Sequence, residues 1–209
     1  MGSDERVGSP AFERNKDPIL GVLQPLWGQG RPRILEVASG PGQHAVYYAS
    51  LLPKTCWQPT DASERLCRSV DAWVAHEGVG AQVSPALRLD VREDAAWPQG
   101  SFEGALAINF LHMVDLATVE TMLRGAARSL VAGGHLVVYD CFTYGSVHVS
   151  PSNEAFDLWL KRETEGGGVH EFDEVDRIAC SFGFKSGAVH RLPSNNQCVV
   201  WESSEVVER

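Results

Sequence analysis

Residues 33–44 read RILEVASGPGQH, and this stretch decides the fold. An apolar run ends at Glu36, a turn containing Gly40 and Gly42 follows, and apolar residues at helical spacing come next. This order predicts a buried strand, a tight turn and the first residues of a helix. Because glycine has no side chain, such a turn lets backbone approach a bound ligand closely.

Two nucleotide-binding motifs compete for this turn. A P-loop is excluded because no Gly-Lys-Ser/Thr follows, and the nicotinamide-cofactor fingerprint lacks its third glycine after Gly40 and Gly42. The turn resembles the first motif of the class I S-adenosylmethionine (SAM)-dependent methyltransferases, acidic-x-Gly-x-Gly-x-Gly, with Ala38 in place of the first glycine. This resemblance implies a Rossmann-like fold with SAM as the cofactor.

Strand and helix patterns alternate along the chain. Apolar runs predict five strands, and a short connection at 193–196 joins two more; the seven strands are expected at 34–37, 55–60, 86–89, 105–110, 135–139, 185–192 and 198–202. Such alternation predicts a parallel sheet with helices on both faces, and the short connection predicts a final antiparallel hairpin. The fold class is therefore α/β: a doubly wound, mostly parallel sheet of seven strands with a terminal antiparallel strand, as in class I methyltransferases.

Local signals predict the boundaries of the helices and loops. We expect residues 1–12 to be disordered and Asp17 to cap the first helix, with Pro18 in its first turn. The helix after the fourth strand is expected to include Leu130, and residues 143–153 are expected to form a polar loop. In this scheme residues 1–30 are an N-terminal tail and lid helix, 31–203 a SAM-binding methyltransferase domain and 204–209 a tail.

Composition narrows the class of protein. The 209 residues fit one α/β domain with a short extension, and the formal net charge of −9 argues against a nucleic-acid partner bound through a basic surface. No apolar run approaches the roughly 18 residues that a membrane helix needs, and the N-terminus has no signal-peptide core. Five scattered cysteines without a C-x-x-C pair indicate reduced thiols, so we expect a cytoplasmic protein without a membrane partner.

Carboxylates follow the predicted strands at the sheet edge where ligands of doubly wound folds bind. Asp61 lies about 20 residues after the glycines, as expected for a carboxylate that binds ribose hydroxyls. Asp90 ends the third strand, where methyltransferases commonly place a carboxylate for the adenine amino group. Each aspartate could alternatively be only a helix or turn cap. The full set of expected cofactor-binding residues is Arg14, Asn15, Glu36, Ala38, Ser39, Gly40, Gly42, His44, Asp61, Asp90, Val91 and Asn109.

Further motifs narrow the resemblance. They comprise R14-N-K-x-P-I, the glycine turn with Q43-H-A, W57-Q-P-x-D, I108-N-x-x-H, S150-P-S-N-E-A-F-D and P193-x-N-N. These segments resemble the family typified by methyltransferase-like protein 26, and the similarity extends from Arg14 to Trp201. The resemblance implies a SAM-binding fold and supplies no substrate.

Acceptor-side residues are expected on loops that leave the same sheet edge. His112, after the fourth strand, is the best candidate for a general base, and its alternative is a structural hydrogen bond. The expected substrate-side residues are Tyr139, Tyr144, His148, Asn153, Asn195 and Asn196, several of which could instead serve only their own turns. A divalent metal held by Asp140 with Asn153 or Glu154 is disfavoured, so no metal is predicted.

These observations predict a SAM-dependent methyltransferase. We expect an O, S or N nucleophile of a small-molecule acceptor, because no basic face or appended recognition domain is evident. A protein methyltransferase is the second enzymatic hypothesis. A SAM-binding module that lacks catalysis and acts through a partner is the non-enzymatic one. The oligomeric state and the methyl acceptor stay open.

Overall fold

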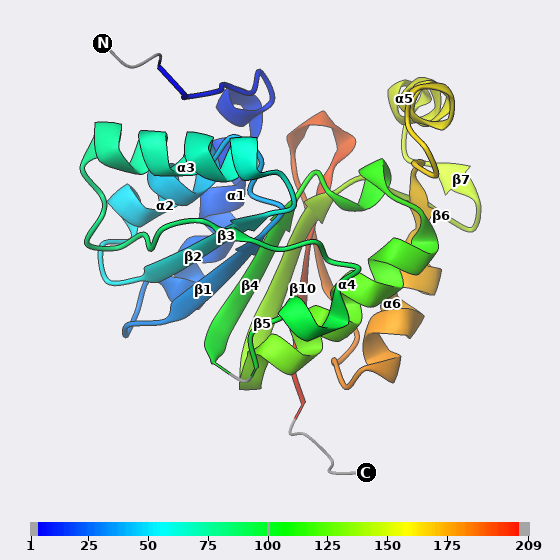
Figure 1. Cartoon of the computed structure of the whole chain (residues 1–209). Coiled ribbons are helices and arrows are strands. Elements are labelled where there is room, and N and C mark those ends of the chain that lie inside the picture. The colour runs from blue at the N-terminus through cyan, green and yellow to red at the C-terminus, as the bar shows by residue number, and fades with distance from the viewer. Residues whose placement is uncertain (1–3, 100, 205–209) are drawn as a thin grey trace.

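A seven-stranded sheet forms the centre of the computed structural model, which describes residues 4–99 and 101–204. Its strands follow the order β3-β2-β1-β4-β5-β10-β9. Their bounds are β1 Arg33–Val37, β2 Cys56–Asp61, β3 Leu87–Arg88, β4 Phe102–Ile108, β5 Leu130–Asp140, β9 Ala188–Arg191 and β10 Gln197–Glu202. Figure 1 shows the strands fanning out with their carboxyl ends gathered near the N-terminal segment and the β9–β10 connection.

Six strands run parallel and one is reversed. β1 pairs in parallel with both β2 and β4, whereas β10 is antiparallel to both β5 and β9. The reversed strand is thus the last in the chain but the second from one edge of the sheet. The predicted fold class is confirmed, and the strand order changes direction between β1 and β4, the position where doubly wound sheets bind ligands.

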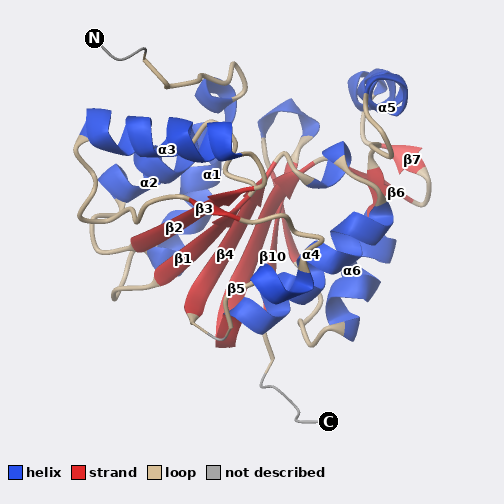
Figure 2. Cartoon of the chain, viewed as in Figure 1, coloured by secondary structure: helices blue, strands red, loops and turns tan. Residues whose placement is uncertain are grey.

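Helices cover both faces of the sheet and bury a hydrophobic cluster on each (Figure 2). One cluster packs α1 and α2 against residues such as Ile34 and Leu106, and the other packs α4 and α6 against residues such as Leu35 and Val138. The helices are α1 Phe12–Trp27, α2 Gln43–Leu51, α3 Glu64–Glu77, α4 Leu116–Ser129, α5 Pro151–Glu163 and α6 Phe172–Ser181, with short 3-10 turns η1 Asp94–Ala96, η2 Leu111–Met113 and η3 Pro193–Asn195. Alternating side-chain directions along each strand explain the two separate clusters.

The first helix begins earlier than the sequence predicts. α1 starts at Phe12 instead of Asp17, and Pro18 lies inside it. The helix extends because Phe12 and Asn15 are buried, so tertiary packing outweighs the local start signal at Pro18. The expected disorder before it is also wrong for residues 4–11, since Val7 accepts a hydrogen bond from the Trp73 indole at 2.8 Å.

Two further boundaries differ from the predictions. α4 ends at Ser129 and Leu130 already belongs to β5, which pairs with Phe102 before a bulge and continues along β4. The expected loop at 143–153 contains part of a second, three-stranded sheet made of β6 Phe142–Tyr144, β7 Val147–His148 and β8 His170–Glu171. Pairing with a distant strand decides both cases, and local sequence signals do not contain that information.

Across residues 4–99 and 101–204, no helix has the length and apolar character needed to cross a bilayer. The tail predicted at 204–209 lies outside the described residues except for Ser204.

Candidate functional site

The turn after β1 is built from residues in unusual backbone conformations. Ala38, Gly40 and Gly42 have φ values of 51°, 58° and 94°, in the left-handed region that favours glycine. A Cβ on Gly42 would lie 2.7 Å from Val70 Cα, so this glycine lets α2 and α3 pack closely. A Cβ on Gly40 would meet no atom within 4 Å. The turn therefore exposes bare backbone at Gly40.

Asp61 connects the end of β2 to this turn. Its carboxylate accepts from the Gly40 backbone N–H at 3.0 Å and from the Ser63 N–H at 2.9 Å. Burial raises its pKa, and the two backbone donors act in the opposite direction. Asp61 thus stabilises the glycine turn, which is part of its expected alternative role, while its side chain also reaches the neighbouring cleft.

Glu36, Ser39 and His44 lie beneath or behind the turn. Glu36 is 2% exposed, its Oε2 has no hydrogen-bond partner among the described residues, and burial raises its pKa to about 8. Ser39 accepts the Thr60 backbone N–H through its hydroxyl. His44 bonds the Asn15 side chain at 2.8 Å, and burial lowers its pKa to about 4, so it is a neutral residue of the α1–α2 packing.

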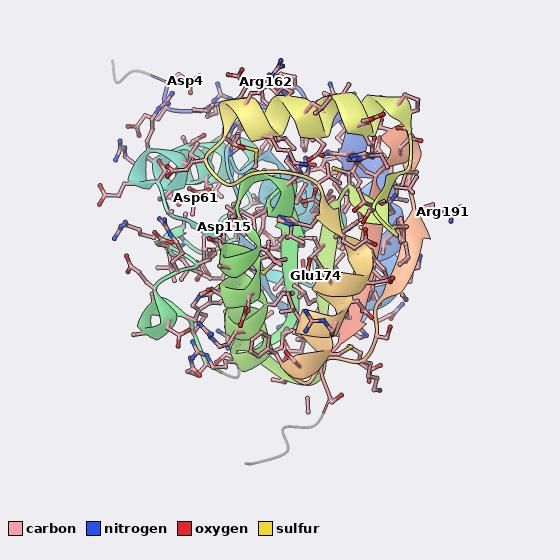
Figure 3. The ribbon with its side chains drawn as sticks, turned by 90° about the vertical axis from the view of Figure 1, so that its right-hand side faces the viewer. Asp4, Asp61, Asp115, Arg162, Glu174 and Arg191 are labelled. Carbon is pink, nitrogen blue, oxygen red and sulfur yellow. The ribbon has the colours of Figure 1, made fainter. Side chains whose placement is uncertain are left out.

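A first cleft of about 480 Å³ opens beside the turn. Ala38, Leu89, Val91, Phe110 and Val114 give it apolar walls; Asp61, Ala62, Asp90, Arg92, Asp115, Thr118, Glu165 and Gly166 complete the lining. Four of these residues are carboxylates and one is an arginine. Figure 3 shows the labelled Asp61 and Asp115 on the same side of the molecule. The first cleft is thus apolar in its walls and acidic in its charge.

Asp90 is already paired within this cleft. Its two carboxylate oxygens accept from the Arg92 guanidinium at 2.9 and 2.7 Å, and this hydrogen-bonded pairing lowers its pKa. Asp90 also lies two residues beyond the short strand β3 rather than at its end. A ligand amino group here would share the carboxylate with Arg92.

A second cleft, of about 520 Å³, lies on the other side of β4. Segments far apart in the chain supply its lining, which consists of Ser9, Ala11, Arg14, Asn15, Asn109, His112, Met113, Tyr139, Cys141, Ser152, Asn153, Phe156, Trp159, Ser194 and Asn196. Phe156 and Trp159 of α5 stack with ring centroids 5.9 Å apart. The lining contains no aspartate or glutamate, and Arg14 is its one permanent cation.

The segment 109–115 separates the two clefts. Phe110, Val114 and Asp115 face the first cleft, while Asn109 and His112 face the second. The segment is held firmly, because the Asn109 backbone N–H donates to the Tyr139 carbonyl at 2.8 Å and His170 lies within 3.0 Å of two of its carbonyls. Asn109 has a φ of 55°, a strained conformation of the kind found at ligand sites.

His112 forms a buried pair with Asp140. Its Nδ1 lies 2.5 Å from the Asp140 carboxylate, and the two residues are 7% and 0% exposed. Burial alone would lower the His112 pKa, but the Asp140 charge and hydrogen bond outweigh it and raise the pKa. Burial would raise the Asp140 pKa, and His112 with two backbone N–H donors lowers it instead. The pair orients the ring so that a proton on Nδ1 leaves Nε2 as the basic nitrogen.

Comparison with known proteins assigns the chain to a family. Residues 6–203 match the family described as "Protein of unknown function (DUF938)". The chain belongs to this family.

Solved structures resemble the fold. An O-methyltransferase family protein from Burkholderia thailandensis matches with a TM-score of 0.82 and 15% identity over 93% of this chain and 58% of that one. The SAM-dependent methyltransferase SibL matches with a TM-score of 0.77 and 18% identity, over 93% of this chain and 56% of that one. Human N-acetylserotonin methyltransferase, in complex with SAM, matches with a TM-score of 0.77 and 15% identity, over 93% of this chain and 53% of that one. The chain thus spans little more than half the length of these proteins, and it has the class I methyltransferase fold.

The structure brings only some of the expected acceptor-side residues together. Tyr139, Asn153 and Asn196 line the second cleft with His112, and Asn196 donates to the Tyr139 hydroxyl at 2.9 Å. The other three side chains lie outside the lining. The Asn195 carbonyl accepts a hydrogen bond from the Asn153 side chain. Tyr144, in β6 of the small sheet, packs on Phe172 of α6. His148 Nε2 lies 3.3 Å from the Asp157 carboxylate of α5.

The partnership between His112 and Asp140 was not predicted from the sequence. Asp140 was considered only as a metal ligand with Asn153 or Glu154, yet its carboxylate bonds His112 and two backbone N–H groups. Cys141 completes a group whose potential ligand atoms lie within 4.8 Å, although burial raises the pKa of this thiol. A polar residue after each of two parallel strands places both residues at the same edge of the sheet, but the strand register that brings them into contact is not indicated by the sequence.

Proposed function

We propose that this protein is a SAM-dependent methyltransferase that binds SAM in the first cleft and a small hydroxyl-bearing acceptor in the second. The single observation that carries the proposal is the His112–Asp140 pair, whose histidine lies on the segment that separates the two clefts. The class I methyltransferase fold, shared with a SAM-bound human enzyme, supports the choice of cofactor.

The residues of the first cleft fit SAM. Leu89, Val91 and Phe110 offer apolar surfaces suited to an adenine ring, and the Asp61 carboxylate would accept hydrogen bonds from ribose hydroxyls. The open space over Gly40 admits a ligand against the backbone. Behind the turn and outside the lining of this cleft, the buried Glu36 side chain has one oxygen without a hydrogen-bond partner among the described residues. Ala38, Asp61, Asp90 and Val91 are therefore proposed cofactor contacts.

When bound, SAM would supply a sulfonium methyl group for transfer to the acceptor oxygen, with S-adenosylhomocysteine as the leaving group. His112 accepts the hydroxyl proton at Nε2, since Nδ1 is engaged by Asp140. Asp140 stabilises the imidazolium that results. The amides of Asn109, Asn153 and Asn196 orient the acceptor, and burial of the pair limits water at the transfer point.

The N-terminal 30 residues are proposed to cover the acceptor. Ser9, Ala11, Arg14 and Asn15 all line the second cleft, so the segment closes it from the α1 side. Residues 31–203 then hold the strand ends, the glycine turn and the His112–Asp140 pair. We also propose that this protein is related to the family typified by methyltransferase-like protein 26.

A methyl-transfer assay tests this function. Purified protein is incubated with methyl-tritiated SAM and matched phenol, thiol and amine acceptors, and the labelled product is separated and identified. Transfer to a phenol oxygen is expected, with a loss of about 10²–10⁴-fold in His112→Gln if the histidine acts as base. Cofactor binding without transfer to any acceptor would favour a non-catalytic SAM-binding module, and transfer unaffected by His112→Gln would refute the base assignment.

A further inference from the structure

The permanently charged side chains that line the two clefts differ in net sign, although the chain as a whole has a net charge of −9. Four carboxylates and one arginine line the first cleft, whereas the second contains no carboxylate and one arginine, Arg14. Among the described residues no carboxylate lines this cavity of about 520 Å³, and the nearby Asp140 carboxylate lies behind His112, with which it is paired. This segregation favours a cationic ligand in the first cleft and an anionic ligand in the second.

Arg14 has donors available for an anion. Within residues 4–99 and 101–204, its guanidinium has one partner, the Pro10 carbonyl at 3.0 Å from Nη1, and arginine carries five N–H donors. Its neighbour Lys16 is instead engaged by Glu13 at 2.6 Å. A planar guanidinium with free donors matches the geometry of a carboxylate, which it binds through two parallel hydrogen bonds.

The other groups of the second cleft define the rest of the ligand. Phe156 packs edge-on against the His112 ring at 5.1 Å and stacks on Trp159, so an aromatic surface extends outward from the base. Met113 and Trp159 are 43% and 45% exposed at this rim, which leaves apolar surface free for a flat ligand. Aromatic and sulfur-containing side chains of this kind favour planar rings.

We propose that the acceptor is a small aromatic hydroxy acid whose carboxylate is bound by Arg14 while its hydroxyl reaches His112. The proposal rests on the proposed function for the hydroxyl end and on the charge segregation for the carboxylate end. Arg14 is then the residue that selects acids over neutral analogues, and the proton from the hydroxyl leaves to His112 Nε2 when the oxygen–methyl bond forms.

Calorimetric titration with matched acid and neutral probes tests this selectivity without requiring turnover. Gallate is compared with methyl gallate, and salicylate with salicylamide, against the wild type, Arg14→Met, Arg14→Lys and the control Arg162→Met. Arg162, labelled in Figure 3, lies on α5 and does not line the second cleft. Replacing it therefore removes the same charge as Arg14→Met without changing the cleft lining. Thermal unfolding confirms that each variant is folded.

We expect the acids to bind about tenfold more tightly than their neutral partners, as one exposed bidentate contact would provide. Arg14→Met should abolish that preference, Arg14→Lys should retain part of it, and Arg162→Met should leave it intact. Added salt should weaken the binding of the acids but not the binding of the neutral probes. Equal binding of acids and neutral probes, no binding of either, or an equal loss in Arg162→Met would overturn the proposal. Acid-selective, Arg14-dependent binding without any methyl transfer would refute the proposed function and leave this inference standing.

Discussion

Replacing Asp140 with asparagine isolates the charge of the buried pair while nearly preserving its shape. Three nitrogen donors meet the carboxylate: the Leu111 N–H at one oxygen, and the Cys141 N–H and His112 Nδ1 at the other. An amide has one oxygen, so its NH₂ group must face either the Leu111 N–H or His112. In the first case the buried Leu111 N–H loses its acceptor. In the second, the buried Cys141 N–H loses its acceptor, and the His112 ring is pushed toward the tautomer whose Nε2 carries the proton.

The expected loss follows from these contacts. One unsatisfied buried N–H and the lost charge assistance to His112 together lower the free energy of unfolding by about 2–4 kcal/mol. The raised His112 pKa means that the pair's contribution is fully present below the ordinary histidine value of 6.5 and is lost as pH rises through the folded value. The lowered Asp140 pKa means that the pair's contribution to stability is present above pH 3.8, the ordinary aspartate pKa, and is lost as pH falls through the pKa of Asp140 in the folded protein. The difference between wild type and variant is therefore largest between pH 3.8 and 6.5.

Urea unfolding across this pH range measures the difference, and NMR titration of the His112 ring measures its pKa directly. That pKa should fall in Asp140→Asn because burial then acts without the opposing carboxylate. The control is Asp176→Asn, which weakens contacts to the Gly187 N–H and the Trp201 indole and lines neither cleft. An unchanged His112 titration, or a stability difference that does not shrink above the folded pKa of His112, would refute this account of the pair.

Further predictions concern the glycine turn, the first cleft, the N-terminal segment and the pH profile. Gly42→Ala should destabilise the protein by about 2–4 kcal/mol in urea unfolding, because its φ is 94° and the new methyl meets Val70 Cα at 2.7 Å; wild-type stability would contradict this. Asp61→Ala should weaken S-adenosylhomocysteine binding in calorimetry by about 1–3 kcal/mol, and unchanged affinity would remove Asp61 from the site. Deleting residues 1–11 should raise the KM for the acceptor several-fold and leave cofactor affinity intact; an unchanged KM would show that this segment does not cover the acceptor. Methyl transfer should fall as pH drops below the raised His112 pKa, since only neutral imidazole accepts a proton, and a pH-independent rate would exclude this base.

Local signals were sufficient for the strands and the turn that form the sheet edge. The apolar run ending at Glu36 and the glycines that follow have few alternatives, and β1 and β2 lie where the sequence predicts. The start of α1 was mispredicted because Pro18 is a strong local signal, whereas burial of Phe12 depends on the completed fold. Short-range pattern therefore predicts elements better than it predicts their ends.

The site itself depends on contacts between distant segments. His112 and Asp140 meet because β4 and β5 pair in a register that places Ile108 beside Tyr139, and no residue near either one indicates that register. The lining of the second cleft comes from α1, α5, β5 and the loops around them, so the cleft that Arg14 lines forms only when the chain is folded. The candidate base could be predicted from its strand-end position, but its partner and the anion-binding Arg14 could not.

A crystal structure of the protein with S-adenosylhomocysteine and gallate tests the central claim most directly. The account predicts the adenosine between the apolar walls of the first cleft and beside Asp61, with the gallate ring against Phe156, a hydroxyl at His112 Nε2 and the carboxylate at Arg14. Adenosine bound outside the first cleft, or both ligands on the same side of the segment 109–115, would contradict it.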